Sequence, residues 1–235
     1  MTDKIVTIKE KRVYGRKSGR PLNASRKAAL NDILPAIAID KDHLSEKGDL
    51  APSSLFNAQF DECWFEIGFG GGEHLSALMQ RHRETAFIGA EPYINGMSAF
   101  IKDIEDEPKD RIRVHMDDAM MVANSLADNS LDGIYVLNPD PWHKKRHYKR
   151  RIINQENLDC FARILKPGAL LIMSTDVPDL ADWMVTHASM HDGFEWEAKC
   201  ADDWRVPPAD WITTQYETKG AKNASKMVYL FFKRK

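Results

Sequence analysis

The sequence predicts an α/β fold with a mostly parallel sheet of seven strands and an antiparallel pair at one edge. From residue 63 onward, short apolar runs alternate with amphipathic segments, as in strands joined by crossover helices. A glycine-rich turn follows the first of these runs. The last two runs, 194–199 and 226–232, have no long helix between them, so we expect them to pair as antiparallel edge strands. The loop between them contains Trp204 and Trp211 and is too long for a simple hairpin turn, so we expect it to be functional.

Five parallel strands are expected before the edge pair. They are predicted at 63–68, 86–91, 111–116, 131–138 and 169–175. The helices that follow them are predicted near 72–82, 94–104, 118–126, 151–165 and 178–190. In an open sheet of this kind, ligands bind beyond the carboxyl ends of the strands. The turns at that edge are therefore the place to look for functional residues.

The chain divides into three parts. Residues 1–22 are basic and have no apolar period, so we expect a mobile arm. Residues 23–62 contain a helix, predicted to begin at the Asn23 cap and to be stopped by Pro35, and then a polar loop. Residues 63–235 form the main domain.

Composition and charge exclude several classes of protein. With 235 residues, of which 43% are hydrophobic and 29% charged, the chain can bury a full core, so it is neither disordered nor fibrous. The net charge is only −2, but basic side chains gather in three segments, 1–26, 143–151 and 219–235. Because phosphates are met locally, this distribution suits a nucleic-acid partner.

Neither a metal nor a membrane is expected. Cys63, Cys160 and Cys200 lack Cys-x-x-Cys spacing and are expected to be buried free thiols in a reducing compartment. His143 and His147 are four residues apart, but basic side chains surround them. No apolar run is long enough for a membrane span, and the N-terminus lacks the apolar core of a signal peptide. We therefore expect a cytoplasmic protein.

The glycine-rich turn indicates a nucleotide-type cofactor. Gly68 and Gly70 follow the first strand, where glycine lets the backbone approach a ligand closely. Glu91 closes the second strand, where a carboxylate can accept hydrogen bonds from both ribose hydroxyls. Glu73 stands where the dinucleotide fingerprint requires its third glycine, and with Glu66 it would repel a pyrophosphate. Such carboxylates suit an ammonium or sulfonium charge, as in S-adenosylmethionine.

Alternatives to this cofactor stay open from the residues alone. Asp117 and Asp118 end the third strand and could hold the adenine amino group of the same cofactor. However, a glycine pair is weak evidence by itself, so the turn could bind nothing. A nicotinamide-dependent oxidoreductase has the same layout of strand, glycines and acid. Titration with S-adenosylmethionine and with NAD distinguishes the two enzymes.

The end of the fourth strand indicates where a reaction takes place. Pro139 and Pro141 restrict the backbone on both sides of Asp140, so its carboxylate is held in place. The basic run 143–151 follows immediately. A fixed carboxylate beside a row of cations suits a site where the carboxylate reads a base and the cations hold the backbone of an RNA. The alternative is an ordinary solvated charged surface.

Three segments together resemble the bacterial tRNA (guanine-N7-)-methyltransferases: Glu66–Glu73, the run from Pro139 to Arg151, and Thr214–Gly220. The resemblance covers most of residues 20–235. It implies a Rossmann-like class I methyltransferase domain at 63–235 that uses S-adenosylmethionine. It further implies that the substrate is tRNA, methylated on N7 of the variable-loop guanine at position 46 to form 7-methylguanosine. No obligatory protein partner is expected.

The resemblance also implies roles for individual residues. The cofactor contacts are the carboxylates of the strand ends and two glycines of the turn: Glu66, Gly68, Gly70, Glu91, Asp118 and Asp140. Asp140 is also the catalytic candidate. The substrate contacts are Lys144, Asp176, Thr214, Gln215, Tyr216 and Glu217. The RNA contacts are Arg146, His147, Tyr148, Lys149, Arg150 and Arg151. Asn138 departs from the family pattern, because many relatives are expected to have an aromatic or apolar residue there.

This chemistry depends on positioning. Guanine N7 has a lone pair and no proton at neutral pH, so it needs no general base, and alignment of the reactants lowers the barrier. Asp140 could stabilise the positive charge that develops on the purine. Asp140, Asp176 or Glu217 could accept hydrogen bonds from guanine N1–H and N2–H. A tRNA-binding scaffold without activity is the alternative outside the enzymes, and the presence of both Asp140 and Glu217 argues against it.

Overall fold

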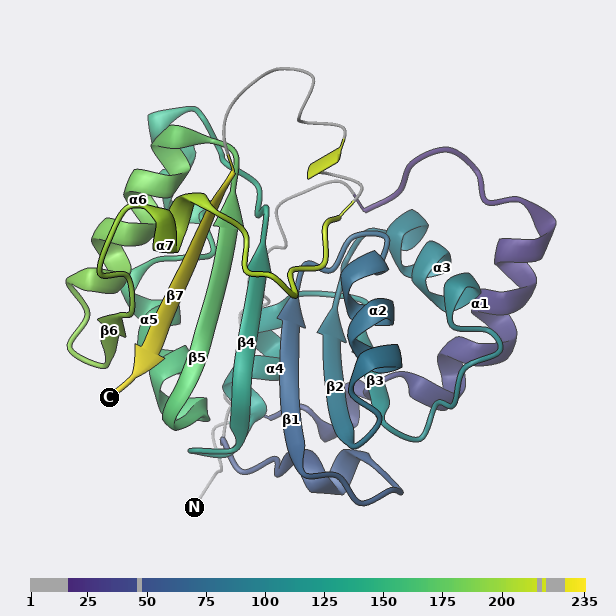
Figure 1. The fold of residues 1–235 in the computed structure, drawn as a ribbon. Helices are drawn as coiled ribbons and strands as arrows, with labels where there is room; N and C mark the ends of the chain where they lie inside the picture. Colours follow the sequence, from purple (N-terminus) through teal and green to yellow (C-terminus); the bar gives the residue numbers. More distant parts are fainter. Residues whose placement is uncertain (1–16, 46–47, 215–216, 219–226) are drawn as a thin grey trace, which may run out of the picture.

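A central sheet of seven strands organises the computed structural model, which describes residues 17–45, 48–214, 217–218 and 227–235. The strands lie in the order β3-β2-β1-β4-β5-β7-β6 (Figure 1). Their bounds are β1 Glu62–Ile67, β2 Thr85–Ala90, β3 Ile112–His115, β4 Leu131–Leu137, β5 Leu165–Thr175, β6 Phe194–Trp196 and β7 Val228–Arg234. The first five strands are parallel, and β7 pairs antiparallel with both β5 and β6. The predicted fold class and its antiparallel edge are confirmed.

Helices cover both faces of the sheet (Figure 1). They are α1 Ala24–Ile37, α2 Glu73–Arg81, α3 Ile94–Asp103, α4 Ala119–Ser125, α5 Gln155–Ile164, α6 Pro178–Ser189 and α7 Asp202–Arg205, with 3-10 turns η1 Lys41–His43, η2 Pro52–Leu55 and η3 Lys145–Arg150. One apolar cluster joins α1, α2 and α3 to β2 and β3, and a second joins α4, α5 and α6 to β1, β4 and β5. Every residue of β2 is buried, as expected for a strand between two helical layers.

Two predicted helix boundaries are wrong. Pro35 does not stop α1, which continues to Ile37, and the Ala38 N–H donates to the Leu34 carbonyl at 2.8 Å. Pro35 lies in the last turn, where only one helical hydrogen bond is lost to its ring. The helix predicted from residue 151 begins instead at Gln155, because the Asn154 side chain caps it and the preceding basic residues form η3.

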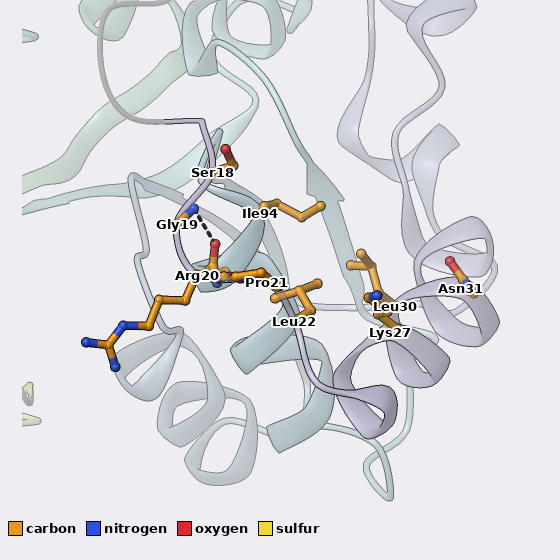
Figure 2. Close-up of a pocket in the computed structure, with 10 residues that line it drawn as sticks. Ser18, Gly19, Arg20, Pro21, Leu22, Lys27, Leu30, Asn31 and Ile94 are labelled. Carbon is orange, nitrogen blue, oxygen red and sulfur yellow. Dashed lines mark hydrogen bonds between the residues drawn. The ribbon is translucent and has the colours of Figure 1, made fainter.

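The end of the predicted N-terminal arm is part of the fold. Asn95 in α3 accepts a hydrogen bond from the Gly19 N–H at 2.8 Å and donates one to the Arg20 carbonyl at 2.7 Å. Figure 2 shows this segment beside α1 and Ile94, around a cavity of about 410 Å³ that none of the predicted site residues lines. Gly19 and Arg20 are therefore bonded to α3, while the division of the chain at residue 22 stays a prediction.

Two further expectations concern the burial of the cysteines and the absence of a membrane-spanning helix. Cys63 and Cys160 are buried free thiols, but Cys200 is exposed, so its predicted burial is wrong. Among the described residues, no helix combines the length and the apolar character that crossing a membrane requires.

Gly133 in β4 makes a close contact that the central sheet requires. A Cβ at Gly133 would lie 2.0 Å from the Trp64 ring, whereas one at Gly168 would lie 3.9 Å from the Lys233 side chain. We expect Gly133→Ala to lower the free energy of unfolding by about 3 kcal/mol through overpacking. Gly168→Ala is the control and should cost about 1 kcal/mol, because its φ of 85° is unfavourable for alanine. Urea denaturation measures both, and an equal loss would contradict the close contact.

Candidate active site

The carboxyl ends of the five parallel strands meet at one edge of the sheet. In Figure 1 the arrowheads of β1, β2 and β4 point to this edge, and the segment after α7 crosses it. The predicted carboxylates lie at these strand ends: Glu66 in β1, Glu91 after β2, Asp118 after β3, Asp140 after β4 and Asp176 after β5. Glu91 and Asp140 are electrostatically coupled, because the charge of Asp140 raises the pKa of Glu91. The structure thus places the predicted carboxylates at one edge of the sheet and brings Glu91 and Asp140 close to each other.

The glycine turn leaves open space beside its backbone. Gly68 and Gly70 have φ values of 72° and 57°, a conformation that side chains disfavour. A Cβ at either position would meet no atom within 4 Å, so the backbone here faces a space that a ligand can fill. Gly72 differs, because its Cβ would lie 2.3 Å from the Phe100 ring. The first two glycines leave room for a ligand, and the third allows Phe100 of α3 to pack against the turn.

Glu91 holds the glycine turn in shape. Its Oε2 accepts the Gly70 N–H at 2.7 Å, and its Oε1 accepts the Tyr93 N–H at 2.8 Å. Burial raises the pKa of Glu91 above the usual range for a glutamate, and the two backbone hydrogen bonds oppose this. Because a carboxylate has about four acceptor sites, two sites are left for a ligand. Glu91 can therefore shape the turn and bind ribose hydroxyls at the same time.

Glu66 forms a buried pair with a residue that sequence reasoning did not assign to the site. His74 Nδ1 lies 2.9 Å from Glu66 Oε2, and both side chains are only 4% exposed. The His74 ring also packs edge-on against Tyr135, with centroids 4.7 Å apart, and lies 6.2 Å from the Trp211 ring. The available signal was the place of His74 in the first turn of the helix after the glycine turn.

Glu217 is buried at the same edge, beside the half-buried Trp211 and Thr214. Trp211 Nε1 donates to Glu217 Oε2 at 3.2 Å, and the Thr214 hydroxyl donates to Glu217 Oε1 at 3.4 Å. Burial raises the pKa of Glu217, and the hydrogen bonds from Trp211 and Thr214 oppose this shift. Trp211 thus brings its loop to the end of the sheet where Glu217 and His74 lie, and a function of that loop stays a prediction. Gln215 and Tyr216, predicted to contact the substrate, lie outside the described residues.

The loop after β4 is strained. Asn138 and Trp142 have φ values of 48° and 47°, a region that costs non-glycine residues about 1–3 kcal/mol each. The Asn138 N–H is held by the Ser174 carbonyl of β5 at 2.9 Å. Asp140 lies between the strained residues and is exposed, while partial desolvation by its surroundings raises its pKa. Strain of this kind concentrates at functional sites, which supports Asp140 as the reactive centre.

The basic segment after this loop presents several cations to solvent. The exposed residues are Lys144, Lys145, Arg146 and Lys149, whereas His147, Tyr148 and Arg150 are half-buried. Desolvation and the charges of Arg150, Arg146 and Lys144 lower the pKa of His147, so its neutral form is favoured.

Arg151, predicted to contact RNA, is buried, which argues against that contact. Its side chain is 1% exposed. Its Nε donates to the Pro141 carbonyl at 2.9 Å, and an Nη donates to Asp179 of α6. A guanidinium enclosed in this way has no surface to offer a phosphate.

Asp118, a predicted cofactor contact, makes a structural contact of its own. Its Oδ1 accepts the Met120 N–H at 2.9 Å, which caps α4. Asp117 lies 3.3 Å from the Lys41 ammonium, so the neighbouring carboxylate is occupied by an ion pair. Asp176 is half-buried directly after β5. The described part of the chain contains no group of three His, Cys, Asp or Glu residues that could hold a metal ion.

Comparison with known proteins decides the class. A model of the family described as "Putative methyltransferase" matches residues 61–230. A tRNA (guanine-N(7)-)-methyltransferase of Brucella anthropi is 40% identical over 222 residues, which are 94% of this chain and 94% of that protein. One of Rhodospirillum rubrum is 40% identical over 224 residues, covering 95% of this chain and 88% of that protein. The chain belongs to the tRNA (guanine-N7-)-methyltransferase family.

Solved structures confirm the methyltransferase fold. The 16S rRNA methyltransferase KamB matches with a TM-score of 0.59 at 13% identity, over 79% of this chain and 94% of that one. A second structure, an antibiotic-related methyltransferase, matches with a TM-score of 0.53 at 19% identity, over 78% and 94%. The predicted Rossmann-like fold is thereby confirmed, and membership of the methyltransferase family sets the oxidoreductase alternative aside. The assignment of single residues to cofactor or substrate stays a prediction.

The buried pair of Glu66 and His74 yields a prediction about stability. We expect His74→Leu to lower the free energy of unfolding by about 3 kcal/mol, because it leaves a carboxylate buried without its partner. Glu66→Gln is the control. It keeps a group that can hydrogen-bond to His74 and should cost about 1 kcal/mol. Thermal and urea denaturation measure both variants, and a His74→Leu protein as stable as the wild type would contradict the pairing.

Proposed function

We propose that this methyltransferase transfers a methyl group from S-adenosylmethionine to N7 of the guanine at position 46 in the variable loop of tRNA. The observation that carries the proposal is the position of Asp140. It lies in a strained loop that joins the acidic, glycine-lined strand ends to the exposed cations of η3. A site with a glycine turn and carboxylates for the cofactor on one side, and a basic surface on the other, suits a reaction on RNA. The names of the relatives support tRNA and guanine N7.

The residues of the glycine turn and of the neighbouring strand ends fit this cofactor. Gly68 and Gly70 leave open space beside their backbone, and Glu91 lies next to them with acceptor sites to spare. Asp118, Asp140 and the buried Glu66 surround the same strand ends and supply negative charge. When bound, S-adenosylmethionine supplies a methyl group on a positively charged sulfur. Acidic surroundings favour such a cation, whereas they would repel a pyrophosphate.

Orientation is the main task of the chain's own residues. Guanine N7 carries no proton at neutral pH, so no side chain has to remove one. The prolines on either side of Asp140 and the backbone bond from Asn138 to β5 restrict where its carboxylate lies. A fixed carboxylate stabilises the positive charge that develops on the methylated purine without having to reorganise. Asp140 is therefore assigned as the catalytic residue.

Recognition of guanine requires acceptors for its N1–H and N2–H groups. Asp176 lies beside Asp140 in the order of the sheet, because β5 neighbours β4. Glu217 is buried and bonded to Trp211 and Thr214, so it orders its own segment and is available to the base only through its remaining acceptor sites. Asp176 and Glu217 are proposed to distinguish guanine from adenine, with Lys144 on the nearby exposed surface holding the nucleotide.

Methyl transfer to unmodified tRNA tests the proposed function. We expect label from S-adenosylmethionine to appear as 7-methylguanosine at position 46, and to disappear when the transcript carries adenosine there. Asp140→Asn should slow single-turnover transfer about 100-fold or more, since it removes the fixed charge. Asp192→Asn, at an exposed position, is the matched control. Circular dichroism checks that each variant is folded, and a near-normal rate for Asp140→Asn would refute its role.

The exposed cations of η3 yield a prediction about binding. We expect the pair Lys145→Glu and Arg146→Glu to weaken tRNA binding and to flatten the slope of log affinity against log salt by about 1.5, as for two lost phosphate contacts. The affinity for S-adenosylmethionine should not change. The control pair Lys199→Glu and Arg205→Glu makes the same charge change elsewhere on the surface. A filter-binding titration in which both pairs have the same effect would exclude a specific RNA surface.

A further inference from the structure

Arg151 is a buried cation at the end of a basic run, and each of its contacts belongs to the protein. It is one of the largest fully buried side chains in the described part of the chain. Its guanidinium carbon lies 3.8 Å from the centre of the Tyr148 ring and 4.9 Å from that of Trp183. Its Nη1 is buried and has no hydrogen-bond partner among the described residues. The five neighbours before it in the run are half-buried or exposed, so Arg151 is set apart from them.

Two hydrogen bonds join the Arg151 guanidinium to different parts of the fold. One goes from Nε to the carbonyl of Pro141 at 2.9 Å, and the other goes from Nη2 to the carboxylate of Asp179. Asp179 is in the first turn of α6, and the Tyr148 hydroxyl also donates to it at 3.3 Å. Through Arg151, the loop after β4 is therefore attached to η3 and to α6.

The Pro141 carbonyl, which accepts the bond from Arg151, lies between Asp140 and the strained residue Trp142. Pro141 directly follows Asp140, and its carbonyl belongs to the peptide that enters Trp142, a residue with a φ of 47°. A non-glycine residue keeps such a conformation only where its surroundings impose it. The Arg151 bond supplies that constraint on one side, as the bond from Asn138 to Ser174 does on the other. Asp140 lies between these two fixed points.

We propose that Arg151 is a positioning residue for methyl transfer: it holds the Pro141 carbonyl, and thereby places Asp140, without touching RNA. The inference rests on the proposed function. Arginine suits this task because its planar fork can bond two acceptors in fixed directions while its face packs on aromatic rings. A lysine ammonium in the same place could keep the charge but not both directed bonds.

The proposal is tested by separating catalysis from binding. We expect Arg151→Met to lower the single-turnover rate about 100-fold, as a small displacement of a reacting group does. The dissociation constant for tRNA and its salt dependence should stay within about twofold of wild type. Arg205→Met is the matched control, because Arg205 is an exposed arginine over the ring of Trp204, at 4.4 Å. It should change neither the rate nor the binding.

A lysine variant distinguishes positioning from phosphate contact. If Arg151 positions the loop, Arg151→Lys restores little of the rate. If it contacts a phosphate, Arg151→Lys restores binding and rate, since a point charge suffices there, and Arg151→Met weakens binding and flattens the salt slope. A restored rate in Arg151→Lys overturns the proposal, and so does weakened tRNA binding in Arg151→Met. Should Arg151→Met fail to fold, the rate of Arg151→Lys decides alone, and a near-normal rate refutes positioning. A wild-type chain that methylates no tRNA would instead refute the proposed function.

Discussion

The parallel direction of five strands is the constraint on which the site depends. It brings the carboxyl ends of β1, β2, β3, β4 and β5 to one edge, although the residues that follow them are far apart in the sequence. No single strand end carries enough chemistry for a reaction. Together they provide a glycine turn, several carboxylates and a basic segment within one region. The antiparallel pair β7 and β6 extends the sheet beyond β5 without interrupting this arrangement.

Several of the predicted ligand-binding carboxylates are already engaged by the protein. Glu66 is paired with His74, Glu91 accepts two backbone N–H groups, and Glu217 is bonded to Trp211 and Thr214. A carboxylate held in this way does not have to reorganise when a ligand arrives, which is the condition for effective electrostatic stabilisation. Asp140 differs from these three because it is exposed, and its position depends on the backbone of its loop. The proposed site therefore combines carboxylates held by the protein with one carboxylate, Asp140, whose place is set by its loop.

Local sequence patterns predicted most of the sheet but not the exposure of single side chains. Apolar runs and turn residues indicated each strand, because burial between two helical layers requires them. Arg151 was indistinguishable from Arg146 in the sequence, since both belong to one basic run. Its burial depends on Asp179 and Trp183, which α6 brings from about thirty residues further along the chain. The docking of Gly19 depends in the same way on Asn95, a contact between distant segments.

The strained loop explains how a reaction without a general base can still require many residues. When no proton has to be moved, the rate depends on geometry, and geometry depends on how firmly a loop is held. Unfavourable φ values at Asn138 and Trp142 would relax in an unsupported loop. Backbone bonding to β5, two prolines and a buried guanidinium oppose that relaxation. Arg151, the last residue of the basic run, therefore supports the loop by bonding to its backbone. The exposed cations of the same run remain available to the substrate.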